Sequence, residues 1–153
     1  MYLTIHAAAG AAIGQFISNP LLAFILGFVS HFILDIIPHG DEGIKHWKWF
    51  KTDLGRLAAA TLIDFFVLCA VAMYWLIYSP VNVFPGMIYG MAGAVLPDTL
   101  WGLHELTGTP LLNWYSKSHS SLHHILKKPL AVQHGFLIQI PLLLAFTWLI
   151  INL

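Results

Sequence analysis

The sequence has few charged residues for its length. Only 9% of its 153 residues are Asp, Glu, Lys or Arg, whereas about a quarter is usual in soluble domains. The seven basic residues balance the seven acidic ones. Binding of nucleic acid calls for a basic patch, so this balance argues against a nucleic-acid partner.

Cysteine is almost absent as well. The one cysteine, Cys69, lies inside an apolar run. A disulfide framework needs paired cysteines and a cysteine zinc site needs several thiolates, so both are excluded. Any metal site in this chain must be built from imidazole and carboxylate groups.

Apolar side chains are abundant instead. Hydrophobic residues make up 58% of the chain and its mean hydropathy is +0.76, more apolar surface than a globule of this size has room to bury. Roughly 20 apolar residues cross the hydrocarbon core as a helix. Five runs reach or approach this length, at about 3–18, 20–38, 56–79, 83–102 and 130–152. The sequence therefore predicts an all-α integral membrane protein, one domain of about five transmembrane helices.

The first of these runs is short and rich in small residues. Gly10 and Gly14 form a small-xxx-small pair, which favours close packing of one membrane helix on another. Residues 1–5 contain no Lys or Arg, whereas a secretory signal begins with a basic segment. We interpret the run as a first span, with a re-entrant or interfacial helix as the alternative.

The basic residues predict the orientation. Two long polar segments, 39–55 and 102–129, fall on the N-terminal side of a five-span protein. That side holds all seven basic residues: Lys45, Lys48, Lys51, Arg56, Lys117, Lys127 and Lys128. The positive-inside rule makes it cytoplasmic. Aromatic residues accompany the lysines in both segments, as in helices that lie at the membrane interface on anionic lipid. A solvated loop is the alternative for each segment.

Ionisable residues gather at one depth of the predicted spans. The cytoplasmic third contains His6, His31, Asp35, Asp64, Asp98 and His134, with His39 at the mouth of the second span. A buried ionisable group costs several kcal/mol unless it is paired or liganded, so such groups indicate function. An internal hydrogen-bond network is the structural alternative.

The residue types favour a metal site. Imidazole with carboxylate and without thiolate suits a divalent ion, zinc first and manganese or iron as alternatives. His31 and Asp35 are four residues apart and share a helix face, a spacing that His119 and His123 repeat. The candidate ligands are His6, His31, Asp35, Asp98, His119, His123 and His134. They outnumber the four that one tetrahedral ion needs, so two ions are also possible.

Two further residues are candidates for a catalytic role. Asp64 and His39 either orient a ligand histidine or carry a proton. Asp64 has a second interpretation, as a helix-packing acid that burial keeps neutral.

Six of the candidate site residues stand in four motifs: His6, His31, Asp35, His39, Asp98 and His119. The motifs are His6-x3-Gly10, Ser30-His31-x3-Asp35-x2-Pro38-His39-Gly40-Asp41, Leu96-Pro97-Asp98-x2-Trp101 and Ser118-His119-Ser120. The set resembles the membrane-bound metal-dependent hydrolase family, small multi-span proteins of bacterial inner membranes that are distantly like zinc-dependent phospholipase C. The resemblance implies metal ligands at His6, His31, Asp35 and His119. The chain departs from the family near the later histidine, where Ser116-Lys117-Ser118 stands in place of the basic residue and threonine often found there.

Three functions are compatible with these patterns. The first is a metal-dependent hydrolase that cleaves a phosphoester, of a lipid or an isoprenoid, at the cytoplasmic interface, with Lys45, Lys48 and Lys117 attracting the anionic headgroup. The second is transport of a metal ion or proton, which the apolar opposite half of the spans opposes. The third is a non-catalytic membrane scaffold whose structural metal has a closed coordination shell.

Overall fold

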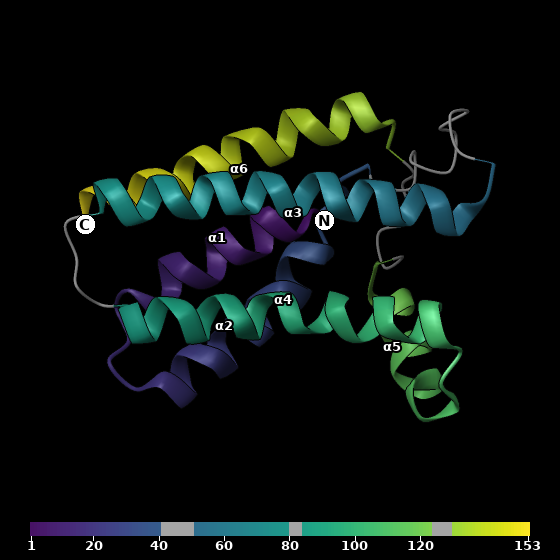
Figure 1. The fold of residues 1–153 in the computed structure, drawn as a ribbon. Helices are drawn as coiled ribbons and strands as arrows, with labels where there is room; N and C mark the ends of the chain where they lie inside the picture. The colour runs from purple at the N-terminus through teal and green to yellow at the C-terminus, as the bar shows by residue number, and fades with distance from the viewer. Residues whose placement is uncertain (41–50, 80–83, 124–129) are drawn as a thin grey trace.

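The computed structural model describes residues 1–40, 51–79, 84–123 and 130–153. These residues form six α-helices, a 3-10 turn and no strand (Figure 1). The elements are α1 (Leu3–Gly14), α2 (Pro20–Asp35), α3 (Asp53–Tyr78), α4 (Phe84–Thr107), η2 (Pro110–Leu112), α5 (Asn113–His123) and α6 (Val132–Asn152). The all-α fold is confirmed.

Local sequence signals set where two of the helices begin. Asn19 caps α2 by accepting a hydrogen bond from the Leu22 N–H, and Pro20 occupies the first helical position, where no N–H partner is needed. Thr52 caps α3 by accepting from the Gly55 N–H. These caps satisfy backbone donors that the helix itself leaves without partners.

Among the described residues, two helices, not five, are long and apolar enough to cross a membrane. They are α3, with 26 residues, and α6, with 21. α1 and α2 have 12 and 16 residues, which corresponds to about 18 and 24 Å against a hydrocarbon core of about 30 Å. α4 has 24 residues, but its glycines, prolines and Asp98 dilute its apolar side chains. Of the five predicted spans, the structure therefore supports the third and the fifth, which correspond to α3 and α6.

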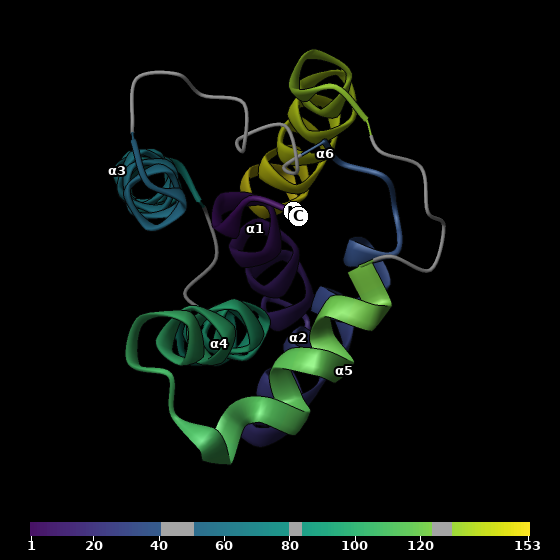
Figure 2. The same ribbon diagram turned by 90° about the vertical axis from the view of Figure 1, so that its right-hand side faces the viewer.

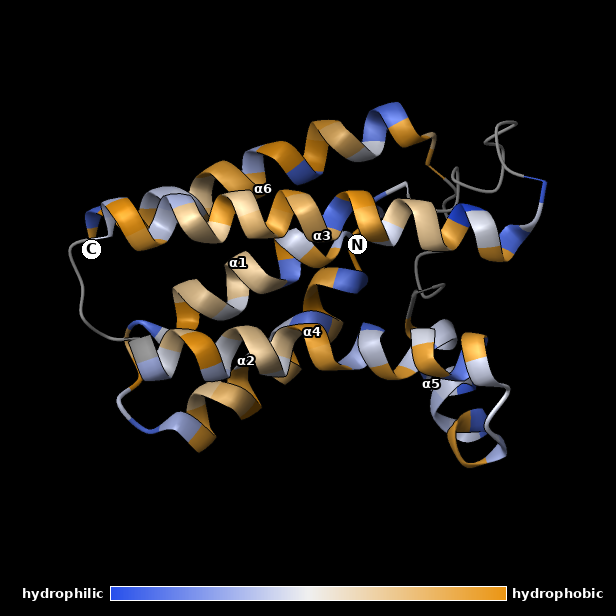
Figure 3. Ribbon diagram, in the orientation of Figure 1, coloured by the Kyte–Doolittle hydropathy of each residue, from blue (hydrophilic) through white to orange (hydrophobic). Residues whose placement is uncertain are grey.

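The apolar surface of α3 and α6 faces outward. Only 11% of the most apolar stretch of α3, and 17% of that of α6, is buried inside the protein. Phe66 on α3 is 69% exposed and Leu137 on α6 is 71% exposed, and both helices are hydrophobic along most of their length (Figure 3). Monomeric soluble proteins rarely expose continuous apolar surface on this scale, which marks contact with lipid or protein.

α1 occupies the centre of the molecule and the other helices surround it (Figure 2). α1, α3 and α6 run in one direction, while α2 and α4 run in the other (Figure 1). The C-terminal half of α2 and the middle of α4 therefore lie beside the first turns of α1. This arrangement brings Asp35 and Asp98 to the same place as His6.

Glycines allow the close approach of α1 and α4. A Cβ atom on Gly10 would collide with the Gly90 carbonyl oxygen, and one on Gly14 with that of Gly86. Gly27 brings α2 against the same Gly90 carbonyl. The close packing predicted for the Gly10/Gly14 pair is confirmed.

A pair of substitutions on α4 tests this packing. Gly90→Ala should destabilise the protein by about 1–3 kcal/mol, because the added methyl group overpacks the α1–α4 contact. Gly102→Ala, on the same helix, should be neutral or stabilise by up to about 1 kcal/mol, since a Cβ there meets nothing within 4 Å. Thermal unfolding of the two variants measures the difference, and equal melting temperatures would contradict the packing role.

The predicted interfacial segments are described only in part. Residues 41–50 and 124–129, which include Lys45, Lys48, Lys127 and Lys128, lie outside the described residues. Within the second segment, α5 is a short polar helix whose Trp114 is largely exposed. An amphipathic residue so placed is typical of a membrane interface.

Candidate metal centre

Four of the predicted ligands converge on one point. His31 and Asp35 come from α2, Asp98 from α4 and His119 from α5, and one ligand atom from each lies within 4.8 Å of all the others. His31, Asp35 and His119 are buried, while the Asp98 side chain is 19% exposed. Three helices far apart in sequence thus build a cluster that is able to hold a metal ion.

The distances within the cluster are short. His31 Nε2 lies 2.9 Å from Asp35 Oδ2 and 3.1 Å from His119 Nε2. Asp98 Oδ1 lies 3.5 Å from His119 Nε2 and 3.7 Å from His31 Nε2. Nitrogen and oxygen ligands of one small cation must approach one another this closely, because each sits about 2.0–2.2 Å from it.

The orientation of His31 favours a cation between these groups. Its Nδ1 lies 2.8 Å from the Ala94 carbonyl oxygen, which only accepts hydrogen bonds, so Nδ1 carries a proton. In the neutral ring, Nε2 then directs a lone pair at the Asp35 carboxylate and at His119. Lone pairs that face one another repel unless a proton or a cation lies between them. A histidine fixed by a carbonyl at its other nitrogen is the usual arrangement of a metal ligand.

His6 adds a fifth donor to the cluster. Its ring stacks on that of His31 with centroids 4.0 Å apart. Its Nε2 lies 3.1 Å from Asp35 Oδ1 and 4.0 Å from Asp98 Oδ2. The residue is fully buried, and its Nδ1 has no hydrogen-bond partner among the described residues. A buried imidazole nitrogen without a hydrogen-bond partner is costly.

The donor set fits a divalent transition metal. Three imidazoles and two carboxylates are ligands that zinc, manganese and iron accept. No thiolate is present, because Cys69 lies on α3 and is exposed. The residues therefore suit the kind of ion that the sequence predicts.

Aromatic residues surround His119. The rings of Tyr115 and Trp101 stack against it, with centroids 5.9 and 6.3 Å away. The Tyr115 hydroxyl donates to the Pro97 carbonyl oxygen at 3.0 Å. Burial and the carboxylates of Asp98 and Asp35 raise the pKa of Tyr115, so its hydroxyl stays protonated as a donor. Sequence reasoning missed Tyr115, although its place one helical turn before His119 is a signal.

His39 lies next to the cluster rather than within it. Its Nδ1 donates to the Ile37 carbonyl oxygen at 2.6 Å, and its Nε2 lies 2.8 Å from the Met1 nitrogen. The same nitrogen lies 2.9 Å from Asp35 Oδ1. His39 is thus linked to the predicted ligand Asp35 by two hydrogen bonds, through the Met1 nitrogen.

Gln139 holds this region in place and was not anticipated. Its side-chain amide donates to the His39 carbonyl oxygen at 2.7 Å, and its amide oxygen accepts from the Tyr2 N–H at 3.0 Å. It is 2% exposed. The sequence signal is a lone amide in an otherwise apolar stretch of α6, which must find partners once buried.

Two other predicted site residues lie apart from the cluster. Asp64, on α3, accepts hydrogen bonds from the Thr4 hydroxyl at 2.5 Å and from the Thr4 N–H at 3.4 Å, so it anchors the first turn of α1. His134 is exposed at the start of α6. The side chain of His123, the last residue of α5, lies outside the described residues.

Comparisons with known proteins find no relative: no protein-family model, no curated protein and no solved structure matches this chain. The described residues define an all-helical fold that combines two membrane-length helices with a largely buried histidine–aspartate cluster.

Proposed function

We propose that this protein is a metal-dependent hydrolase that cleaves a phosphoester of a membrane lipid or isoprenoid at the cytoplasmic face of the inner membrane. The observation that carries the proposal is the orientation of His31. Its Nδ1 is bound to the Ala94 carbonyl, and its Nε2 faces Asp35 and His119. The motif resemblance to membrane-bound metal-dependent hydrolases supports the same proposal.

The proposed ion is zinc, with manganese or iron as alternatives. His31, Asp35, Asp98 and His119 would hold it, and His6 enlarges the donor set enough for a second ion. When bound, such an ion offsets charge on phosphoryl oxygens and lowers the pKa of a water molecule to about 7.

The chain's own residues would serve the reaction in three ways. Asp98 is the partly exposed member of the cluster, so a substrate reaches the centre on its side. His39 holds a proton at Nδ1 and accepts at Nε2, which fits it to relay protons near Asp35. Lys117 is exposed two residues before His119 and attracts an anionic headgroup.

A scaffold with a structural metal is the second candidate. The burial of His31, Asp35 and His119 favours it, because structural metal sites are closed to solvent. It differs from the hydrolase in requiring no open coordination position. The exposure of Asp98 is the feature that favours the hydrolase.

Purified protein and a panel of phosphoesters test the proposal. Release of phosphate or headgroup from a phospholipid or a polyprenyl phosphate should require added divalent metal and stop with a chelator. The rate should rise with pH as water deprotonates. A fully metallated protein that is inert on every phosphoester, and that melts when chelated, would favour the scaffold instead.

Labelling tests the proposed orientation of α3 and α6. We propose that both cross the membrane from the cytoplasm, because Lys51 and Arg56 flank the start of α3 and the two helices run in the same direction. In a Cys69→Ser background, Lys51→Cys should resist a membrane-impermeant thiol reagent in intact cells, whereas Asn152→Cys should react. The reverse labelling pattern would contradict the orientation.

A further inference from the structure

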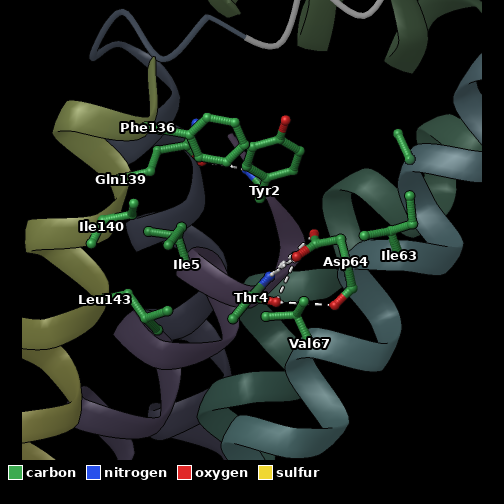
Figure 4. Close-up of a pocket in the computed structure, with 11 residues that line it drawn as sticks. Tyr2, Thr4, Ile5, Ile63, Asp64, Val67, Phe136, Gln139, Ile140 and Leu143 are labelled. Carbon is green, nitrogen blue, oxygen red and sulfur yellow. Dashed lines mark hydrogen bonds between the residues drawn. The ribbon is translucent and has the colours of Figure 1, made fainter. Parts of the chain in front are cut away.

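A second feature lies between α1, α3 and α6, built from residues other than those of the metal centre. It is a cleft with a volume of about 240 Å³ (Figure 4). α3 provides Ala60, Ile63 and Val67 on one wall, while α6 provides Ile140 and Leu143 on the other. The stacked rings of Tyr2 and Phe136, 5.6 Å apart, border it.

Asp64, Thr4 and Gln139, which line this cleft, already have hydrogen-bond partners within the protein. Asp64 accepts from both the hydroxyl and the N–H of Thr4. Gln139 uses its amide nitrogen on the His39 carbonyl and its amide oxygen on the Tyr2 N–H. A water molecule in a cavity needs two to four polar partners, and apolar cavities without them take up apolar molecules instead. Apart from the Tyr2 hydroxyl, the remaining lining is hydrocarbon, so the cleft is suited to an apolar occupant.

The walls of the cleft indicate which apolar occupant it meets. In the part of the chain that the structure describes, α3 and α6 are the two helices long and apolar enough to cross a membrane. They contact each other toward their C-terminal ends, where the Trp75 indole donates to the Thr147 hydroxyl and the Ser79 hydroxyl to the Ile150 carbonyl. At Ile63 and Val67 the cleft separates them. In a bilayer, the space between two membrane-length helices borders directly on lipid tails.

We propose that this cleft binds one hydrocarbon chain of a membrane lipid, between α3 and α6. Close-packed interiors leave few voids larger than a water molecule, and the chain fills a space that the protein's own side chains leave open. The proposal depends on membrane insertion of α3 and α6. It does not depend on the reaction at the metal centre.

Photolabelling in vesicles tests the proposal with a matched pair of variants. The full-length protein is reconstituted into phosphatidylglycerol vesicles that contain an analogue with a diazirine along its acyl chain. After irradiation, we expect Ile63, Val67 and Ile140 to be labelled. Ala60→Phe fills the cleft and should reduce this labelling several-fold, whereas Ala58→Phe, exposed two residues earlier on α3, should not.

Further readouts keep the result decisive. Bound metal, measured in both variants, reports whether the fold is intact, and Val67→Trp fills the cleft from the same helix if Ala60→Phe does not fold. Equal labelling of the two alanine variants would show contact with bulk lipid only and overturn the proposal. Labelling absent from the wild type, together with chemical cross-links between copies through α3, would assign the cleft to a second copy and overturn it too.

Discussion

Replacing Asp35 with alanine is expected to weaken the binding of divalent metal at least about a hundredfold. Removing a residue that merely orients a metal ligand already lowers metal affinity about 10–100-fold. Asp35 is more central than such a residue, because its two oxygens lie 3.1 Å from His6 Nε2 and 2.9 Å from His31 Nε2. His31→Ala should have a similar effect. Equilibrium competition with a chelating dye measures each affinity.

His134→Ala is the matched control for these two variants. His134 was predicted as a ligand from its depth in the last span, but it is exposed at the start of α6. We therefore expect its replacement to leave the metal affinity unchanged. If Asp35→Ala and His31→Ala bind metal with wild-type affinity, the cluster is not the metal site. If His134→Ala loses metal binding, His134 is a ligand after all.

Replacing Asp98 with alanine is expected to abolish phosphoester hydrolysis. Asp98 is the one partly exposed member of the cluster, so it lies where a substrate would meet the metal. Its Oδ1 also lies within 3.5 Å of His119 Nε2, so its loss removes a ligand as well as a charge. Steady-state kinetics on the best substrate of the panel measures the loss in kcat.

Substitution of Lys117 separates catalysis from substrate capture. Lys117→Ala should raise KM and leave kcat almost unchanged, because the exposed Lys117 charge attracts the headgroup and is not a member of the cluster. The KM effect should shrink at high ionic strength. A kcat in Asp98→Ala equal to that of the wild type would contradict the role of Asp98.

Hydropathy alone predicted the helical class and most helix positions, but it overestimated the number of membrane-length helices. Apolar runs mark buried or lipid-facing helices equally well. The run from residue 3 ends as a helix at Gly14, and that from residue 20 at Asp35. Both helices instead pack closely against α4 through glycines such as Gly10 and Gly27, and apolar periodicity does not report this packing.

The core of the site was predictable because its ligands follow helix spacing. His31 and Asp35 share a face of α2, and Asp98 and His119 join them as predicted. Depth along a span was a weaker guide: Asp64 has the predicted depth, yet it faces Thr4 in the first turn of α1. Depth fixes the position along a helix but not the direction of a side chain around it. Gln139 and Tyr115 were missed because single residues show their roles only through tertiary contacts.

Metal analysis of the purified protein tests the central claim most directly. Protein produced in zinc-supplemented medium and washed free of loose metal should retain at least about one divalent ion per chain, held by nitrogen and oxygen ligands. X-ray absorption at the metal edge should show imidazole scattering and no sulfur, and the Asp35→Ala variant should lose the signal. Wild-type protein that is folded, free of metal and unchanged in melting temperature on addition of zinc would contradict a metal centre at His31, Asp35, Asp98 and His119.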